Sequence, residues 1–292
     1  SLGKLTPFYT KMLFDMVDDY MERNLQDILT VASLIGELEF YLGAHHFTER
    51  LDKFGIPHSF PKYEGNVVDV TGLHNPLLIL QEEGGNGFKS VPNDVYFDAE
   101  KRLYVVTGPN DGGKSVYLRA VGLLVLLGQN GYQIPAPEGT LAPMDEVFTH
   151  FIPKDDITRR RGRYRQELQQ LRYIFENATS DSLVLLDEPC GGTDPGQGSK
   201  QSLTALKQLY RFGPRAVFAT HMHNVSEEIE GAEYPYAHNL QVGVEIPDGS
   251  PVLTYKVSPG RAGHSFGDLV AKDVGVDEVS LHKLLEERFP AK

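Results

Sequence analysis

The N-terminal part of the chain has the hydrophobic spacing of a long helix. Apolar side chains recur at steps of three and four residues between residues 8 and 54, and no glycine or proline interrupts residues 8–35. The positions that set this spacing are Phe14, Val17, Met21, Leu25, Ile28, Leu29, Val31, Leu34, Ile35, Leu38, Leu42 and Phe47. The pattern predicts either a helical hairpin or one long lever with a single apolar face. Gly55, Pro57 and Pro61 end it.

Beyond Asn66 the pattern changes to short apolar runs separated by helical stretches. We expect strands at residues 67–70, 77–80, 95–97, 103–107, 147–151, 183–186, 216–219, 240–246 and 252–257. We expect helices at residues 114–127, 164–178 and 199–210, and after residues 265 and 277. Strands that alternate with helices favour an α/β fold with a mainly parallel sheet covered on both faces. The chain therefore divides into a helical segment, residues 1–60, and an α/β domain, residues 61–292.

The strongest chemical signal is a glycine-rich run between an expected strand and an expected helix. Residues 108–115 satisfy the spacing G-x-x-x-x-G-K-[ST] of a P-loop NTPase. Glycines let backbone N–H groups approach phosphates, and the helix start presents its positive end to them. We expect Lys114 to reach the β- and γ-phosphates of ATP and the Ser115 hydroxyl to bind Mg²⁺. The residues expected to hold the nucleotide are Gly108, Pro109, Asn110, Asp111, Gly112, Gly113, Lys114, Ser115 and Val116.

A second signal is a buried strand that ends in two acids. Four apolar residues, 183–186, precede Asp187 and Glu188. Ligands of open α/β sheets gather at the carboxyl ends of the strands, so we expect Asp187 to bind Mg²⁺ and Glu188 to orient or deprotonate the attacking water. Alone, two such acids would more simply begin a solvated turn. The adjacent acids favour an ATPase over a GTPase, and the sequence has no guanine-reading Asn-Lys-x-Asp motif.

His221 follows the next buried strand, at the same expected edge of the sheet. A histidine there would hydrogen-bond the γ-phosphate and sense its loss. The alternative is a surface histidine with no role in the site.

Composition excludes several classes of protein. The 292 residues are 40% hydrophobic and 23% charged, which is ordinary for a globular protein. The longest apolar run, residues 120–128, is shorter than the ~20 residues of a membrane helix. Cys190 is the one cysteine, which fits a cytoplasmic protein. The net charge of −12 makes the chain as a whole a poor ligand for nucleic-acid backbone.

Several motifs together resemble the ATPase domain of the MutS family of ABC-type ATPases, over roughly residues 60–276. They include Thr107 to Ser115, similar to TGPNxGGKS; residues 91–94, similar to VPND; residues 177–179; residues 218–221; and the closing Gly263 to Gly267 with Val270 and Ala271. The resemblance implies an Mg²⁺-dependent ATPase head that forms a homodimer through a composite ATP site. It also implies that DNA is bound by regions outside this chain. Residues 120–124, 134–136 and 192–195 resemble the branch without a mismatch-reading domain, where recombination control or ribosome-linked rescue is the implied role.

The sequence departs from the family pattern at the signature that acts on the partner subunit. Where the family has Ser-Thr-Phe and a later Glu, this chain has Gly162, Arg163, Tyr164 and Glu167, so the serine hydroxyl is lost. Five arginines lie within residues 159–165. They fit a solvated helix start, a basic patch for nucleic acid, or an arginine finger supplied by Arg163.

The expected adenine pocket departs as well. Ser90 stands where the family usually has an aromatic residue, and Tyr255 falls at a stacking position. Tyr255 would cover one face of the purine, or would simply pack on its strand. Cys190 follows Glu188 closely, but without a His–acid partnership we expect a structural thiol.

Two other functions stay open from the sequence. The degraded signature fits a nucleotide-binding switch with little hydrolysis. The acids at residues 187–188 also suit a transporter or chromosome-structuring ATPase head, although the signature and long arms of those proteins are missing.

Overall fold

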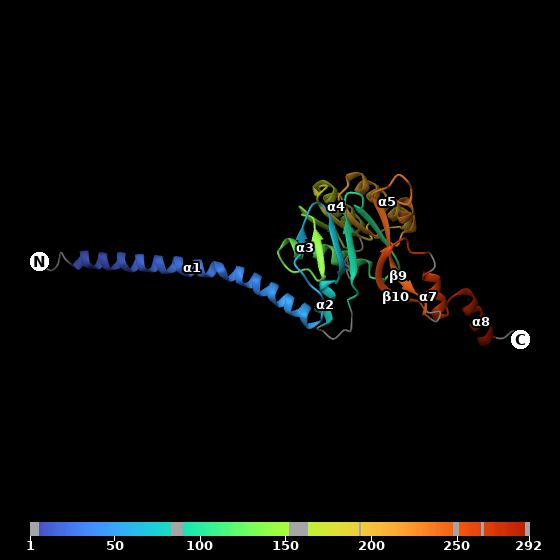
Figure 1. The fold of residues 1–292 in the computed structure, drawn as a ribbon, viewed down its shortest axis with the longest axis horizontal. Helices are drawn as coiled ribbons and strands as arrows, with labels where there is room; N and C mark the ends of the chain where they lie inside the picture. Colours follow the sequence, from blue (N-terminus) through green and yellow to red (C-terminus); the bar gives the residue numbers. More distant parts are fainter. Residues whose placement is uncertain are drawn as a thin grey trace. The chain divides into compact units, whose positions relative to one another are not determined.

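The computed structural model describes residues 6–82, 90–151, 163–192, 194–247, 251–263 and 266–289. The chain forms two compact units, residues 1–53 and 54–292 (Figure 1). No helix in these described ranges combines the length and the apolar character needed to cross a membrane.

The first unit contains one uninterrupted helix, α1, Thr6–Lys53. The expectation of a long lever is therefore confirmed, and that of a helical hairpin is wrong. The expected single apolar face is wrong, because at about 3.6 residues per turn the exposed side chains of Leu13 and Phe40 lie on opposite sides of the helix.

The second unit is built on a six-stranded sheet in the order β10-β9-β4-β8-β7-β6. Its strands are β4, Leu103–Thr107; β6, Val147–His150; β7, Leu183–Asp187; β8, Arg215–Ala219; β9, Ala237–Glu245; and β10, Val252–Pro259. All neighbours are parallel except β9 and β10. This confirms a mostly parallel sheet in a mixed α/β fold.

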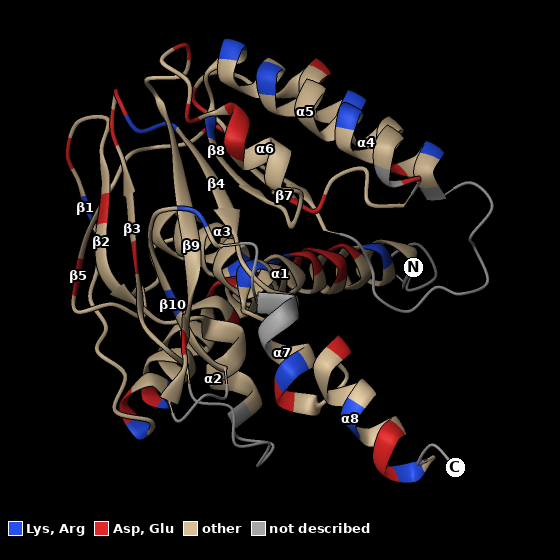
Figure 2. Ribbon diagram, turned by 90° about the vertical axis from the view of Figure 1, so that its right-hand side faces the viewer, with Lys and Arg blue, Asp and Glu red and all other residues tan. Residues whose placement is uncertain are grey.

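Helices cover both faces of this sheet because its central strands are apolar on both sides. Helix α3, Lys114–Gln129, packs on the face that presents Val106, Leu185 and Val217. Helices α4, Arg163–Asn177, and α5, Pro195–Phe212, pack on the face that presents Leu186 and Phe218. The short α6, His223–Glu228, lies on the same side as α4 and α5 (Figure 2). Helices α7, Phe266–Val274, and α8, Glu278–Arg288, end the described chain.

A second, four-stranded sheet was not expected from the sequence. Its order is β1-β5-β2-β3, with β1, Lys62–Tyr63; β2, Val68–Leu73; β3, Asn93–Phe97; and β5, Glu138–Leu141. Alternate residues of β2 and β3, such as Val70 and Val95, join the same core as α3. Helix α3 is thus enclosed by apolar residues of both sheets.

The strand expected at residues 77–80 is wrong, because this run belongs to helix α2, Pro76–Glu82. The Oδ1 atom of Asn75 accepts a hydrogen bond from the N–H of Leu77 at 2.8 Å, and Pro76 begins the helix. An Asn cap followed by Pro is a helix-start signal. It determines that this apolar run is helical, because the run is too short to show a helical or strand period of its own.

The buried strand β7, which lies between β8 and β6, should contribute strongly to stability. Leu185 is fully buried and packs against Gly122 of α3, where a Cβ atom would lie 2.8 Å from it. We expect Leu185→Ala to lower the free energy of unfolding by about 2–5 kcal/mol in a urea titration, because it leaves a cavity. Leu126→Ala, on the exposed side of α3, is the matched control and should cost less than about 1 kcal/mol. Equal losses would contradict this packing.

Candidate nucleotide-binding site

The glycine-rich run forms a tight loop between β4 and α3. Gly108 and Gly113 have φ angles of 149° and 96°, which strongly favour glycine. At Gly112 a Cβ atom would lie 3.0 Å from the carbonyl oxygen of Pro109. Gly113 is the N-cap of α3, so the first N–H groups of the helix follow the loop directly. The arrangement is that of an anion-binding helix start.

Lys114 is held inside this loop. Its side chain is 5% exposed, and Nζ donates to the carbonyl oxygens of Gly108 at 2.9 Å and Pro109 at 3.0 Å. Glu188 Oε1 lies 3.6 Å from the same nitrogen. Burial lowers the pKa of Lys114, while the charge and hydrogen bond of Glu188 oppose that shift. A buried ammonium group bound to loop carbonyls can exchange them for phosphate oxygens.

Asp187 and Ser115 meet where β7 ends and α3 begins. Burial raises the pKa of Asp187, and a hydrogen bond with Ser115 acts in the opposite direction. The buried Oδ1 of Asp187 has no hydrogen-bond partner in the part of the chain that the structure describes. Such an acceptor calls for a further donor or a cation. One carboxylate and one hydroxyl suit Mg²⁺, which takes few protein ligands and completes its shell with water and phosphate oxygens.

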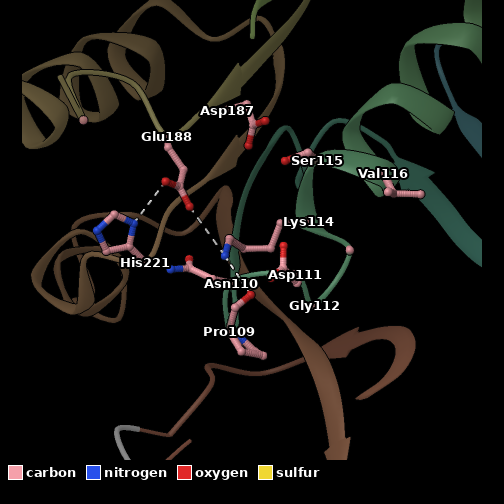
Figure 3. Close-up of a pocket in the computed structure, with 12 residues that line it drawn as sticks. Pro109, Asn110, Asp111, Gly112, Lys114, Ser115, Val116, Asp187, Glu188 and His221 are labelled. Carbon is pink, nitrogen blue, oxygen red and sulfur yellow. Dashed lines mark hydrogen bonds and ion pairs between the residues drawn. The ribbon is translucent and has the colours of Figure 1, made fainter. Parts of the chain in front are cut away.

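Glu188 lies between Lys114 and His221 (Figure 3). Its backbone has a left-handed φ of 48°, while its N–H still donates to the carbonyl of Ala219 at 2.9 Å. This turn explains how two consecutive acids can face one cavity, although side chains alternate within a strand. Glu188 Oε2 lies 3.2 Å from Nδ1 of His221. The hydrogen bond between them lowers the pKa of Glu188 and raises the pKa of His221.

These groups line one cavity of about 490 Å³. Its lining residues are Pro109, Asn110, Asp111, Gly112, Gly113, Lys114, Ser115, Val116, Asp187, Glu188, Gly191 and His221. The cavity thus brings together the expected phosphate, metal, base and sensor residues. Gly108 contributes its carbonyl oxygen to Lys114 rather than a surface of the cavity.

A second cavity of about 390 Å³ adjoins the first, and the two share Asp111, Gly113 and Val116. Tyr255 lines this second cavity, with its ring 3.3 Å from the position of a Cβ atom at Gly113. The other lining residues, none of which was expected in an adenine pocket, are Leu73, Asn75, Leu78, Val91, Asn93, Tyr117 and Ala120. The segment at residues 91–94, which runs into the start of β3, was the signal in the sequence for Val91 and Asn93.

The signature residues are only partly described. Gly162 and the side chain of Arg163 lie outside the described residues. Glu167 is buried in its own chain, and its Oε2 accepts a hydrogen bond from the N–H of Gly192 at 3.3 Å. Ser90, which replaces an expected aromatic residue, is buried and accepts a hydrogen bond from the N–H of Asn75 at 3.1 Å.

Cys190 agrees with the expectation of a structural thiol. It is fully buried, and burial raises the pKa of the thiol to about 11. A protonated, enclosed thiol is a poor nucleophile.

The pairing of Glu188 with His221 gives a measurable pH dependence. We expect the NMR titration of His221 to have its midpoint above 6.5, and Glu188→Gln to bring it down. Because the folded pKa of His221 is raised, its contribution to stability is complete below 6.5 and is lost as the pH rises through that folded pKa. Because the folded pKa of Glu188 is lowered, its contribution is complete above 4.5 and is lost as the pH falls through that pKa.

The control for this titration is Glu176→Gln, which changes an exposed carboxylate paired with Arg172 on α4. It should leave the midpoint of His221 unchanged. A wild-type midpoint at or below 6.5, or one that Glu188→Gln does not move, would contradict the pairing.

Comparison with known proteins identifies the family. The model of MutS domain V matches residues 104–285. Among similar proteins are the DNA mismatch repair proteins MutS of Halothermothrix orenii, 31% identical over 90% of this chain, and Thermosipho melanesiensis, 36% identical over 88%. The protein of the same name from Thermotoga maritima is 29% identical over 96% of this chain. The chain spans 29% of the first and second of these relatives and 34% of the third. With its domain V covering most of the chain, the protein belongs to the MutS family.

Proposed function

We propose that this chain is an Mg²⁺-dependent ATPase head that converts ATP and water to ADP and phosphate. One observation carries the proposal: a buried lysine, a carboxylate–hydroxyl pair and a glutamate–histidine pair line one cavity at the start of α3. Lys114 and the loop from Gly108 to Val116 hold the phosphates. Family membership supports nucleotide use by this domain.

The side chains divide the work as follows. Ser115 and Asp187 hold Mg²⁺, which supplies positive charge next to the phosphate oxygens. Lys114 leaves its loop carbonyls for the β- and γ-phosphates, which frees Glu188 from one partner. Glu188 then orients the attacking water and accepts its proton. His221 hydrogen-bonds the γ-phosphate and senses its loss.

The second cavity holds the base of the nucleotide. It adjoins the phosphate cavity, is lined mainly by aliphatic and tyrosine side chains, and includes the ring of Tyr255 in its lining. An apolar slot beside an aromatic ring suits a purine. The adjacent acids and the missing guanine-reading motif support adenine over guanine.

The active unit is a homodimer in the cytoplasm. The segment before α4 would reach the γ-phosphate on the partner subunit, where Arg163 acts as an arginine finger in place of the missing serine. Nucleotide binding would shift the dimer between open and closed states. DNA would be bound by regions outside this chain, and the similarity to DNA mismatch repair proteins supports a role on DNA. Residues 120–124, 134–136 and 192–195 support the branch without a mismatch-reading domain.

A nucleotide switch with little hydrolysis is the second candidate. Two observations favour it. The signature serine is replaced by Gly162, and the carboxylate of Glu188 is already paired with both Lys114 and His221. A transporter or chromosome-structuring head has less support, because the matched family model is MutS domain V.

Single-turnover cleavage of Mg²⁺-ATP tests the reaction. We expect Glu188→Gln to retain ATP binding but to cleave it at least about 10²-fold more slowly, because the proton acceptor is removed. Lys114→Ala should lose binding, because its ammonium group is the cation held in the loop. Glu176→Gln is the matched control and should behave as the wild type. Binding without cleavage by the wild-type protein would replace the ATPase with the switch, and no binding would refute both.

The composite site predicts a nucleotide-dependent dimer. In size-exclusion chromatography, the Glu188→Gln variant should form a dimer with Mg²⁺-ATP and not without it. Arg163→Ala should lower turnover of the dimer by about 10³-fold, the effect of a lost arginine finger, and leave ATP affinity unchanged. A monomer under every condition would contradict the composite site. Equal losses of turnover and affinity would argue against the finger.

A further inference from the structure

Strand β10 contains a bulge beside the apolar cavity. Residues 254–256 face the single residue Gly243 of β9, because the regular pairing resumes only at Val257 with Val242. Gly243 fits this position, since a Cβ atom there would overlap the hydroxyl of Thr254. A bulge removes backbone groups from the ladder of the sheet, and those groups need other partners.

Asn93, the first residue of β3, supplies two of these partners. Its Nδ2 donates to the carbonyl oxygen of Tyr255 at 3.1 Å, and its Oδ1 accepts from the N–H of Val257 at 2.7 Å. The same Nδ2 also donates to the carbonyl oxygen of Val91 at 3.3 Å. The side-chain amide of Asn93 therefore supplies hydrogen bonds that a neighbouring strand would otherwise make. It also links the bulge to the segment at residues 91–94.

Tyr255 is the residue that this arrangement fixes. Its φ angle is 56°, a left-handed conformation that a residue with a side chain adopts only when its surroundings hold it. The ammonium group of Lys256 donates to the carbonyl of Pro92 and ties the next residue of the bulge to the same segment. The ring of Tyr255 lies next to Gly113 and lines the cavity.

Tyr255 is also the aromatic ring of the cavity with a free surface. It is 47% exposed, whereas Tyr117 is buried and its hydroxyl donates to the carbonyl of Asp94 at 3.0 Å. The remaining walls include the aliphatic Leu73 and Leu78. A flat base entering this cavity would therefore depend on Tyr255 for stacking.

We infer that Asn93 is a positioning residue for the base of the nucleotide, acting through Tyr255. Its amide is already committed to three backbone groups, so it sets the place of the ring rather than reading the base itself. This inference rests on the proposed nucleotide site and adds the residue that orients its base-binding half.

Equilibrium binding of Mg²⁺-ATP and of Mg²⁺-tripolyphosphate, which has no base, tests this inference. Asn93→Ala and Tyr255→Ala should each weaken ATP binding on the order of tenfold, because stacking on the base is lost. The double variant should be no weaker than Tyr255→Ala alone. Binding of tripolyphosphate should stay at the wild-type level in all three proteins, because the phosphate loop is untouched.

Two further variants separate positioning from general damage to the fold. Tyr255→Phe keeps the ring and should bind ATP as the wild type does. Asn93→Asp keeps the acceptor for Val257 and loses the donor to Tyr255, so its ATP affinity should lie between those of the wild type and Asn93→Ala.

Three results with the variants would overturn the inference: unchanged ATP affinity in Asn93→Ala, an additional loss in the double variant as large as in the single one, or an equal loss for tripolyphosphate. A wild-type protein that binds neither probe would instead refute the nucleotide site itself. A wild-type protein that binds both equally would show that the base contributes nothing, and this too would overturn the inference.

Discussion

The register of three parallel strands determines what this domain can do. Ala219 of β8 pairs with Val106 of β4 on one side and with Asp187 of β7 on the other. Because the three strands end at one level, the loop after β4, the acids of β7 and the histidine after β8 emerge together. A slip of one residue would turn every second side chain to the opposite face and break both cores along with the site. The apolar character of β7 and β8 on both faces therefore protects the chemistry as much as the fold.

Charge balance is the second constraint on the site. Lys114 is a buried cation in a chain of net charge −12, and its neighbours are loop carbonyls and Glu188. Each group in the row Lys114, Glu188 and His221 stabilises the charged form of the next. Such a row tolerates burial because no charge in it stands alone. A triphosphate bound with its cation would interact with all three charged groups. Binding at the loop and the protonation of Glu188 are therefore linked.

Much of this arrangement could be predicted from local sequence. The P-loop is recognisable from the spacing of its glycines and lysine. Asp187, Glu188 and His221 lie at or just after the ends of clearly apolar strands, so a parallel sheet predicts that they meet at one edge. The left-handed turn at Glu188 and its pairing with His221 could not be predicted, because they depend on how neighbouring strands end. The strand expected at residues 77–80 was wrong, because four apolar residues are too few to distinguish the period of a helix from that of a strand. The helix start at Asn75 and Pro76 makes this run helical.

The apolar cavity shows where local patterns are insufficient. Its walls come from β2, α2, β3, α3 and β10, and the bulge in β10 has no signature in the sequence beyond the small residue opposite it. The second sheet escaped prediction for a related reason. Its strands are short and are separated in sequence by α2, β4 and α3, so their pairing is a property of the folded chain.

Helix α1 has a practical consequence for anyone who works with this chain. Its aliphatic and aromatic side chains face solvent on more than one side, as in Leu13, Ile28 and Phe40. Water-exposed surfaces of this kind attract one another, and the attraction grows with sulfate or phosphate in the buffer and does not depend on nucleotide. Nonspecific association through these apolar side chains would then add to the nucleotide-dependent dimer proposed above. Only the difference made by adding and removing ATP reports on that dimer.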